Sequence, residues 1–154
     1  ESTDGWVEFY AAPFFNKDGS EMIYVGSQDD YRQVKVLNLN TNVVTARTSG
    51  KFVVTELLKY NKDSDVIIYT ANIPDDIKAQ HVYAIKNQAG ATAVCLTCNL
   101  HEGHTYYNAE VSEGGNHIVI LANGPAVPRT DLYELKVEGN YAKIDELETN
   151  FKAF

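Results

Sequence analysis

The nine residues Asn16–Tyr24, NKDGSEMIY, recur without a gap at Asn61–Tyr69 as NKDSDVIIY, and more faintly at Ser112–Ile120 as SEGGNHIVI. The chain is therefore an array of one repeating unit, with spacings of 45 and 51 residues. Repeats in this range include four-stranded sheets that cannot bury both faces alone. We therefore expect neighbouring units to stack and to share their cores.

Each unit predicts four short strands divided by turns rich in Asn, Asp and Gly, the pattern of an all-β fold. The expected strands are Val7–Phe15, Met22–Gly26, Gln33–Leu39 and Val43–Thr48, then Val53–Tyr60, Val66–Ala71, His81–Ile85 and Thr92–Leu96, and finally Tyr106–Val111, His117–Ala122, Asp131–Leu135 and Ala142–Asp145. Two longer loops, Asn72–Gln80 and Asn123–Thr130, are expected to project between the second and third strands of their units.

The second strand of each unit is apolar at successive positions, in the segments MIYV, VIIY and IVIL. Continuous apolar strands are typical of sheets covered on both faces, whereas a lone sandwich leaves one polar face on many strands. The pattern therefore favours about three four-stranded antiparallel blades of a β-propeller. Because propellers close with roughly 4 to 8 blades, we expect a fragment whose two ends expose apolar sheet faces for further blades to cover.

The expected blades are residues 5–51, 52–102 and 103–147, followed by a tail at 148–154. Around this tail, Leu147, Phe151 and Phe154 have the spacing of one or two amphipathic helical turns. Such a tail would either lead into a further domain or fold back on the last blade.

Composition excludes several classes of protein. The chain has 154 residues, of which 44% are hydrophobic and 22% charged, as in folded globular domains. It contains no apolar run of about 18 residues and no signal-peptide pattern at its start. A net charge of −8 without a Lys/Arg cluster argues against binding to nucleic acid. No cofactor is predicted, because Gly114-Gly115 belongs to a hairpin turn and not to a phosphate-binding loop before a helix.

Cys95 and Cys98, in the segment CLTC, allow a disulfide, half of a zinc site or a redox centre. Structural zinc needs four ligands, and His101 and His104 follow at spacings that do not match a zinc motif. A redox centre needs a strand-to-helix context that lowers a thiol pKa. We favour the disulfide, which places the chain in an oxidising compartment, and we predict no metal site.

No catalytic residue is predicted. None of the six serines lies in a G-x-S-x-G turn. The acidic pairs Asp29-Asp30 and Asp75-Asp76 are expected to form solvated turns. We expect Tyr24, Tyr69 and Tyr83 to pack in the core.

Taken together, several short motifs resemble the later blades of the dipeptidyl peptidase IV family propeller. The most specific is CLTCNL at 95–100, followed by Tyr106-Tyr107 and Gly124-Pro125. The others are Gly5-Trp6-Val7, Asp18-Gly19, Tyr31-Arg32 and His81-Val82-Tyr83. The chain departs from the family pattern at Gln80, where an Arg is common, and at Phe52, where a Trp is usual.

The resemblance implies part of an eight-bladed propeller attached to an α/β-hydrolase domain, in type II membrane or secreted serine exopeptidases that remove N-terminal dipeptides. It implies a disulfide between Cys95 and Cys98, and an aromatic side chain facing the substrate cavity at Phe9 or Tyr10. The family's catalytic and amine-binding residues lie outside the matched stretch, so none is carried over. Implied partners are a peptide substrate in the full-length protein, the remaining blades, the hydrolase domain, and other proteins or a second copy.

We therefore expect a non-catalytic propeller segment that restricts access to a hydrolase site located elsewhere, in an extracellular or cell-surface protein. The alternative is a protein-binding module of a catalytically inactive relative, which would use the loops Asn72–Gln80 and Asn123–Thr130. A third hypothesis is a free-standing secreted β repeat protein, which would remain monomeric.

Overall fold

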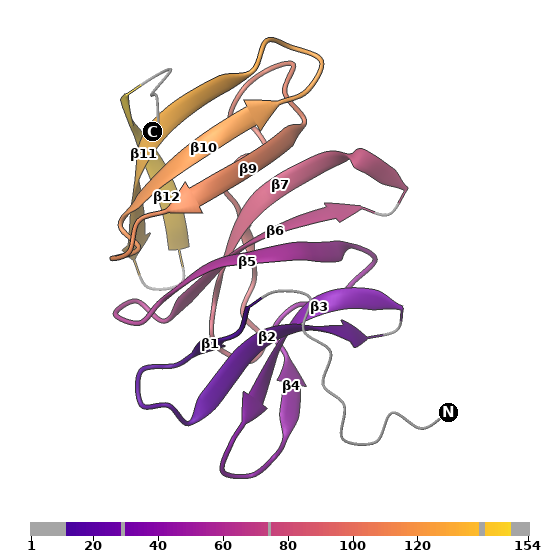
Figure 1. Ribbon diagram of the computed structural model, residues 1–154, viewed down its shortest axis with the longest axis vertical. Helices are drawn as coiled ribbons and strands as arrows, with labels where there is room; N and C mark the ends of the chain where they lie inside the picture. Colours follow the sequence, from indigo (N-terminus) through magenta and orange to yellow (C-terminus); the bar gives the residue numbers. More distant parts are fainter. Residues whose placement is uncertain (1–11, 29, 74, 139–140, 149–154) are drawn as a thin grey trace.

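The computed structural model describes residues 12–28, 30–73, 75–138 and 141–148, and all regular secondary structure within these ranges is β (Figure 1). The strands are β1 (Phe14–Phe15), β2 (Glu21–Gln28), β3 (Tyr31–Asn38), β4 (Val44–Ala46), β5 (Val53–Asn61), β6 (Val66–Ile73), β7 (Asp76–Lys86), β8 (Val94–Cys95), β9 (Tyr106–Val111), β10 (His117–Asn123), β11 (Arg129–Glu138) and β12 (Tyr141–Glu148). These ranges contain no helix long and apolar enough to cross a membrane.

The strands form three successive antiparallel groups of four. β1 to β4 make one sheet in sequence order. In the second sheet, β5, β6 and β7 lie side by side with β8 on the far edge of β7, and β9 to β12 follow in order. A parallel bridge between Gln80 and Tyr106 joins these two groups. Figure 1 shows the three groups succeeding one another along the long axis of the molecule. The fold is that of about three propeller blades, as the repeat predicted.

β6 is buried on both faces, which confirms the prediction drawn from its apolar segment VIIY. Ile67 and Tyr69 pack in a core shared with β2 and β3 of the first sheet. Ile68 points the other way, into a core shared with β9, β10 and β11. Adjacent residues of one strand therefore belong to two different cores, because successive side chains alternate between the faces of a sheet.

The first sheet ends the stack with an apolar row on its outer face. Phe15 pairs with Met22, Met22 with Leu37, and Leu37 with Val44, so the four side chains cross the sheet on one face. The ends of the row are well exposed, with Phe15 at 48% and Val44 at 46%. The neighbouring pair, Phe14 and Ile23, points to the opposite face of the sheet and packs in the core. An exposed apolar face is what the sequence predicted for an end of the array.

Several predicted segments differ in the structure. The projecting loop expected at Asn72–Gln80 is wrong, because β6 continues to Ile73 and β7 begins at Asp76. Gln80 holds the extended strand in place: its buried side chain donates to the carbonyl of Tyr107 at 2.9 Å and accepts from Thr55 at 3.0 Å. A buried polar side chain that is fully bonded fixes backbone direction, and the sequence alone did not reveal these partners.

The helical tail expected from Leu147 onward is also wrong over the described part, since β12 runs to Glu148 and pairs with β11. The strand expected at Val7–Phe15 is described only from residue 12, and β1 covers Phe14–Phe15. The loop expected at Asn123–Thr130 is present in shorter form, at residues 124–128 between β10 and β11.

Candidate functional site

The segment Leu96–Thr105, here called the connector, carries the most distinctive sequence of the chain and links β8 to β9. It begins as a continuation of the β7–β8 ladder, with the amide of Leu96 donating to the carbonyl of Val82 at 2.8 Å. The amide of Val82 then donates to the hydroxyl of Thr97 at 3.1 Å. Because a side chain replaces the backbone acceptor at fully buried Thr97, the ladder ends there and the chain turns back.

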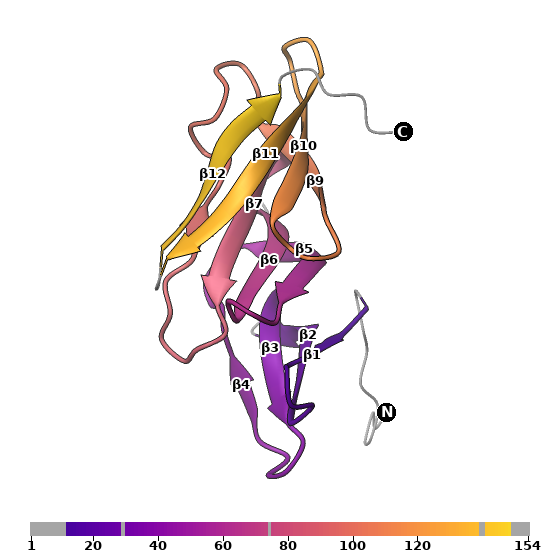
Figure 2. The ribbon, with the colours of Figure 1, turned by 90° about the vertical axis from the view of Figure 1, so that its left-hand side faces the viewer.

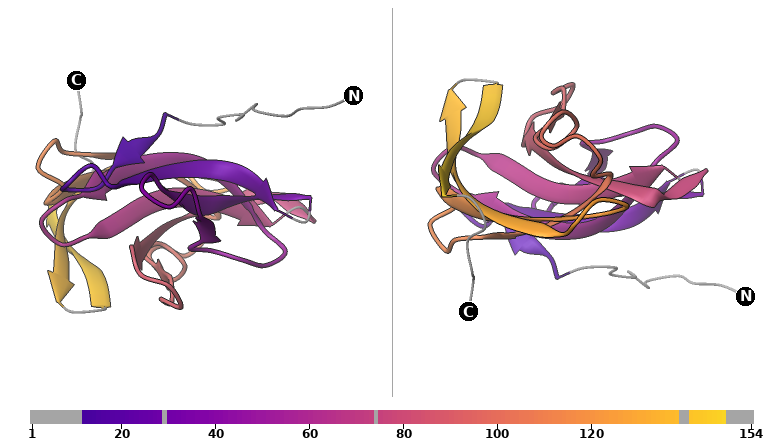
Figure 3. Two further views of the ribbon diagram at one scale, coloured as in Figure 1. Left: turned by 90° about the horizontal axis from the view of Figure 1, so that it is seen from below. Right: turned by 90° about the horizontal axis from the view of Figure 1, so that it is seen from above.

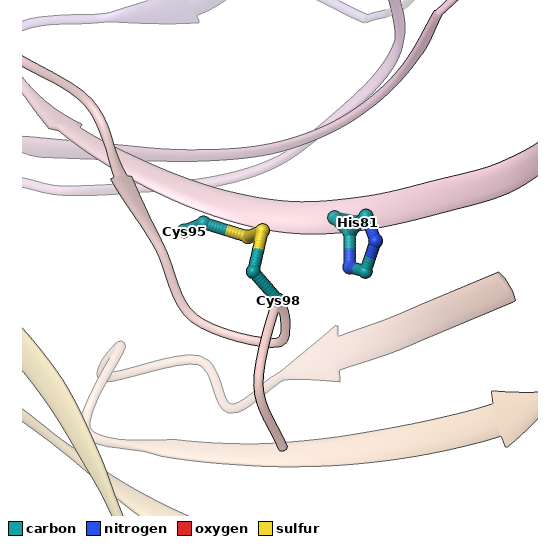
Figure 4. A group of neighbouring side chains, drawn as sticks. All are labelled: His81, Cys95 and Cys98. Atoms are coloured by element: carbon teal, nitrogen blue, oxygen red, sulfur yellow. A yellow bond between two sulfur atoms is a disulfide. The ribbon is translucent and has the colours of Figure 1, made fainter. Parts of the chain in front are cut away.

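This turn places two cysteines beside a histidine of β7. Cys95 and Cys98 are joined by a disulfide, with their Cα atoms 5.7 Å apart. Figure 4 shows the disulfide and the ring of His81 on the same side of β7. One ring nitrogen of His81 and the two sulfurs all lie within 4.8 Å of one another. Burial lowers the pKa of His81 below its ordinary value of 6.5, because charge is disfavoured away from water.

His81 is held from two directions. Its Nδ1 lies 2.9 Å from the hydroxyl of Thr97, and its ring packs against Tyr107 with the centroids 5.4 Å apart. The ring orientation is therefore set by a connector residue and by a β9 residue together.

The middle of the connector is bound to β11 by a buried charged cluster. His101 Nε2 lies 2.9 Å from Asp131 Oδ2 and 3.1 Å from the Tyr133 hydroxyl. Arg129 donates to both carboxylate oxygens of Asp131, at 2.8 and 3.2 Å. Hydrogen bonding to Asp131 raises the pKa of Arg129, and burial raises the pKa of Tyr133. Through His101, the cluster binds the connector to β11. Asp131 is 1% exposed, so its carboxylate is not open to a ligand.

The end of the connector meets the loop that contains Gly124-Pro125. His104 Nε2 donates to the carbonyl of Val127 at 2.8 Å, and the Tyr107 hydroxyl donates to the carbonyls of His101 and His104 at 3.4 Å. Gly124 has φ +147°, and a Cβ there would lie 3.2 Å from the amide of Thr105. Glycine is required because the loop backbone passes so close to the connector. The CLTCNL segment, the tyrosine pair and the Gly-Pro loop thus form one assembly.

His101 and His104, whose spacing from Cys98 does not match a zinc motif, contact β11 and the loop before it and not the disulfide. The histidine beside the cysteines is His81, which the sequence did not single out. Strand register brings it there: Tyr83 of β7 lies opposite Cys95 of β8, so His81 comes level with Thr97, between the two cysteines. The candidate cavity residues Phe9 and Tyr10 lie outside the described residues.

The connector also borders a groove. Cys95, Leu96, Asn99 and Leu100 face Lys143 and Ile144 of β12 across it. Figures 2 and 3 show the connector and β12 on the same side of the stack. The disulfide therefore lies at an accessible margin of the sheets and not inside a core.

Comparison with known proteins gives a consistent result. Residues 1–129 match the family described as the dipeptidyl peptidase IV (DPP IV) N-terminal region. The inactive dipeptidyl peptidase 10 of Rattus norvegicus is 23% identical in an alignment 151 residues long, which covers 91% of this chain and 19% of that protein. Dipeptidyl peptidase 4 of Arthroderma otae is 25% identical over 139 residues, covering 88% of this chain and 17% of that protein.

Among solved structures, a candidate dipeptidyl aminopeptidase IV from Bacteroides ovatus superposes with a TM-score of 0.67 at 16% identity. The match covers 90% of this chain and 21% of that one. At this identity the superposition supports the fold alone. The chain spans about a fifth of the length of the curated relatives it matches.

Proposed function

This chain belongs to the family of the DPP IV N-terminal region, and from that premise we propose that it is a non-catalytic propeller segment of a DPP IV-like serine exopeptidase. In this proposal the segment restricts peptide access to an α/β-hydrolase domain carried elsewhere in the parent protein. Its blades are residues 5–51, 52–102 and 103–147, within an eight-bladed ring. Phe9 or Tyr10 would face the substrate cavity.

The observation that carries this proposal is the apolar row on the outer face of the first sheet, Phe15, Met22, Leu37 and Val44. On the opposite face of the same sheet, Ile23 and Val36 are almost fully buried by the neighbouring sheet. A further blade packed on the outer row would repeat this arrangement. Exposed contiguous apolar surface on a protein usually marks a contact with another surface, and propeller blades pack face to face.

The disulfide at Cys95 and Cys98 supports a parent protein that folds in an oxidising compartment, at the cell surface or outside the cell. The named relatives support a peptidase parent, since dipeptidyl peptidase 4 is among them. Peptide substrates, membrane anchoring and dimer formation would all be properties of that longer protein.

The proposal is tested by assaying a chromogenic Gly-Pro or Ala-Pro dipeptide with two proteins. One is the 154-residue chain, and the other continues through the downstream reading frame. We expect turnover that a serine-directed inhibitor blocks in the longer protein and none in the short chain. Inhibitor-sensitive turnover by the 154-residue chain would contradict the non-catalytic role.

A second candidate function is a protein-binding module in a catalytically inactive parent, favoured by the match to inactive dipeptidyl peptidase 10. Because the segment expected to project at Asn72–Gln80 is largely strand, the loop at residues 124–128 is the remaining projecting element of the two. A downstream hydrolase domain that lacks the serine of G-x-S-x-G would select this function. An intact serine would select the peptidase.

A further inference from the structure

We propose that His81, Cys95 and Cys98 form a binding site for a zinc-type divalent cation that becomes available when the disulfide is reduced. The proposal concerns this chain's own side chains and does not depend on the activity of the parent protein. Among the residues that the structure describes, these three are the set whose possible ligand atoms converge within 4.8 Å.

The three side chains are the types that zinc selects. Zinc is bound by cysteine thiolates and histidine nitrogens at about 2.0 to 2.3 Å, and two cysteines separated by two residues are a recurrent half of such sites. At those bond lengths, tetrahedral ligands lie roughly 3.3 to 3.8 Å apart. The two sulfurs are bonded to each other in the disulfide, so after reduction they must move apart to roughly 3.8 Å. The His81 nitrogen lies within 4.8 Å of both sulfurs and needs to approach them by at most about 1 Å.

The backbone already holds the set together. Cys95 lies in β8, opposite Tyr83 of β7, and His81 is two residues from Tyr83 on the same face of β7. Thr97 turns the chain so that Cys98 comes back to the same place, and its hydroxyl contacts the His81 ring at 2.9 Å. A histidine oriented by a second side chain is typical of metal ligands. Figure 4 shows the resulting grouping on one side of β7.

Access to the site is open. Cys98 is exposed, and Cys95 and His81 are half-buried. Three protein ligands leave a fourth coordination position, which water can fill. The site is therefore expected to resemble an exchangeable zinc site and not a closed structural one.

The redox step determines when the site exists. A disulfide presents no thiolate, and thiolates are the ligands that bind metal. A phosphine reductant cleaves the S–S bond, taking oxygen from water to become the phosphine oxide and leaving two thiols. Zn²⁺ then displaces the two thiol protons and binds two thiolates and one neutral imidazole nitrogen, so that the charges at the site cancel.

The test is zinc titration of the 154-residue chain, with and without a phosphine reductant, followed by calorimetry and by the absorption of bound Co²⁺. We expect one ion for each reduced chain, a cobalt–thiolate charge-transfer band, and no comparable binding by the oxidised chain. His81→Gln should weaken zinc binding at least about tenfold, because even residues that only orient ligands have effects of that size. His117→Gln, at the exposed start of β10, is the matched control and should bind as the unmodified chain does.

Equal affinity of the reduced and oxidised chains would overturn the proposal, as would unchanged affinity in His81→Gln. Circular dichroism of each protein checks that the β structure survives reduction and substitution. If His81→Gln does not fold, Cys98→Ser replaces it, because Cys98 is exposed. That variant should lose tight binding and the charge-transfer band, and their retention would contradict the assignment.

Discussion

His101 lies 2.9 Å from Asp131 although 30 residues separate them in the sequence. The contact binds the connector to β11. Because the connector follows β8 and contains Cys98 of the disulfide, it joins the second group of strands to the third. Asp131 also accepts hydrogen bonds from Arg129, two residues earlier in the same strand, so the carboxylate that contacts the connector is held within β11 as well. The stacked sheets are therefore stabilised by this hydrogen-bonded cluster as well as by their two apolar cores.

Asp131→Ala should destabilise the chain by about 3 kcal/mol, because it leaves Arg129 and His101 without their buried partner. Urea unfolding followed by circular dichroism measures the effect. The control is Asp145→Ala, which removes an exposed carboxylate 2.9 Å from Lys136. Exposed ion pairs contribute little, so equal losses in the two variants would show that Asp131 has no special role.

Ile67→Ala and Ile68→Ala should each cost about 2 to 5 kcal/mol, because each residue fills a different core and both are fully buried. Val119→Ala on β10, whose side chain is only half-buried, serves as the reference and should cost less. A small effect at either isoleucine would contradict burial of β6 on both faces.

The chain studied alone should self-associate through its outer apolar row. Replacing Phe15 and Val44 together by Lys should yield a monomer, because charge at both ends of the row prevents apolar contact between copies. Sedimentation velocity measures the change. Val127→Lys is the control, since Val127 is 83% exposed in the loop before Pro128 and lies outside the row. A wild-type chain that stays monomeric at high concentration would favour a free-standing repeat protein.

Stability should fall at alkaline pH, in part because of Tyr69. Burial, with a smaller contribution from Tyr83, raises the pKa of Tyr69 above its ordinary value of 10.0. As the pH rises beyond about 10, the unfolded chain loses this proton while the folded chain keeps it, so the free energy of unfolding decreases. The contribution is fully present below that pH.

Tyr69→Phe removes the titrating group and should therefore make the alkaline decrease shallower. Urea unfolding of both proteins, from pH 8 to pH 11, measures the difference. The pH 8 values provide the baseline for any change in packing. Parallel curves for the two proteins over the whole range would exclude a contribution from Tyr69.

Much of the fold was predictable because local rules agree with the tertiary structure. The repeat and its turns placed most of the described strands to within a few residues, and the apolar segment VIIY predicted a strand covered on both faces. The error at Asn72–Gln80 came from reading turn-forming residues as a long loop. The backbone there stays extended because Gln80 is buried and bonded to Tyr107 and Thr55, partners that no local pattern reveals.

The sequence by itself determined the repeating all-β architecture and favoured a disulfide between Cys95 and Cys98, because periodicity and a spacing of two residues are local properties. Only the tertiary structure decided which histidine stands beside those cysteines and which carboxylate holds the connector. His81 and Asp131 reach their places through strand register and the stacking of sheets, and both depend on contacts between residues far apart in the chain.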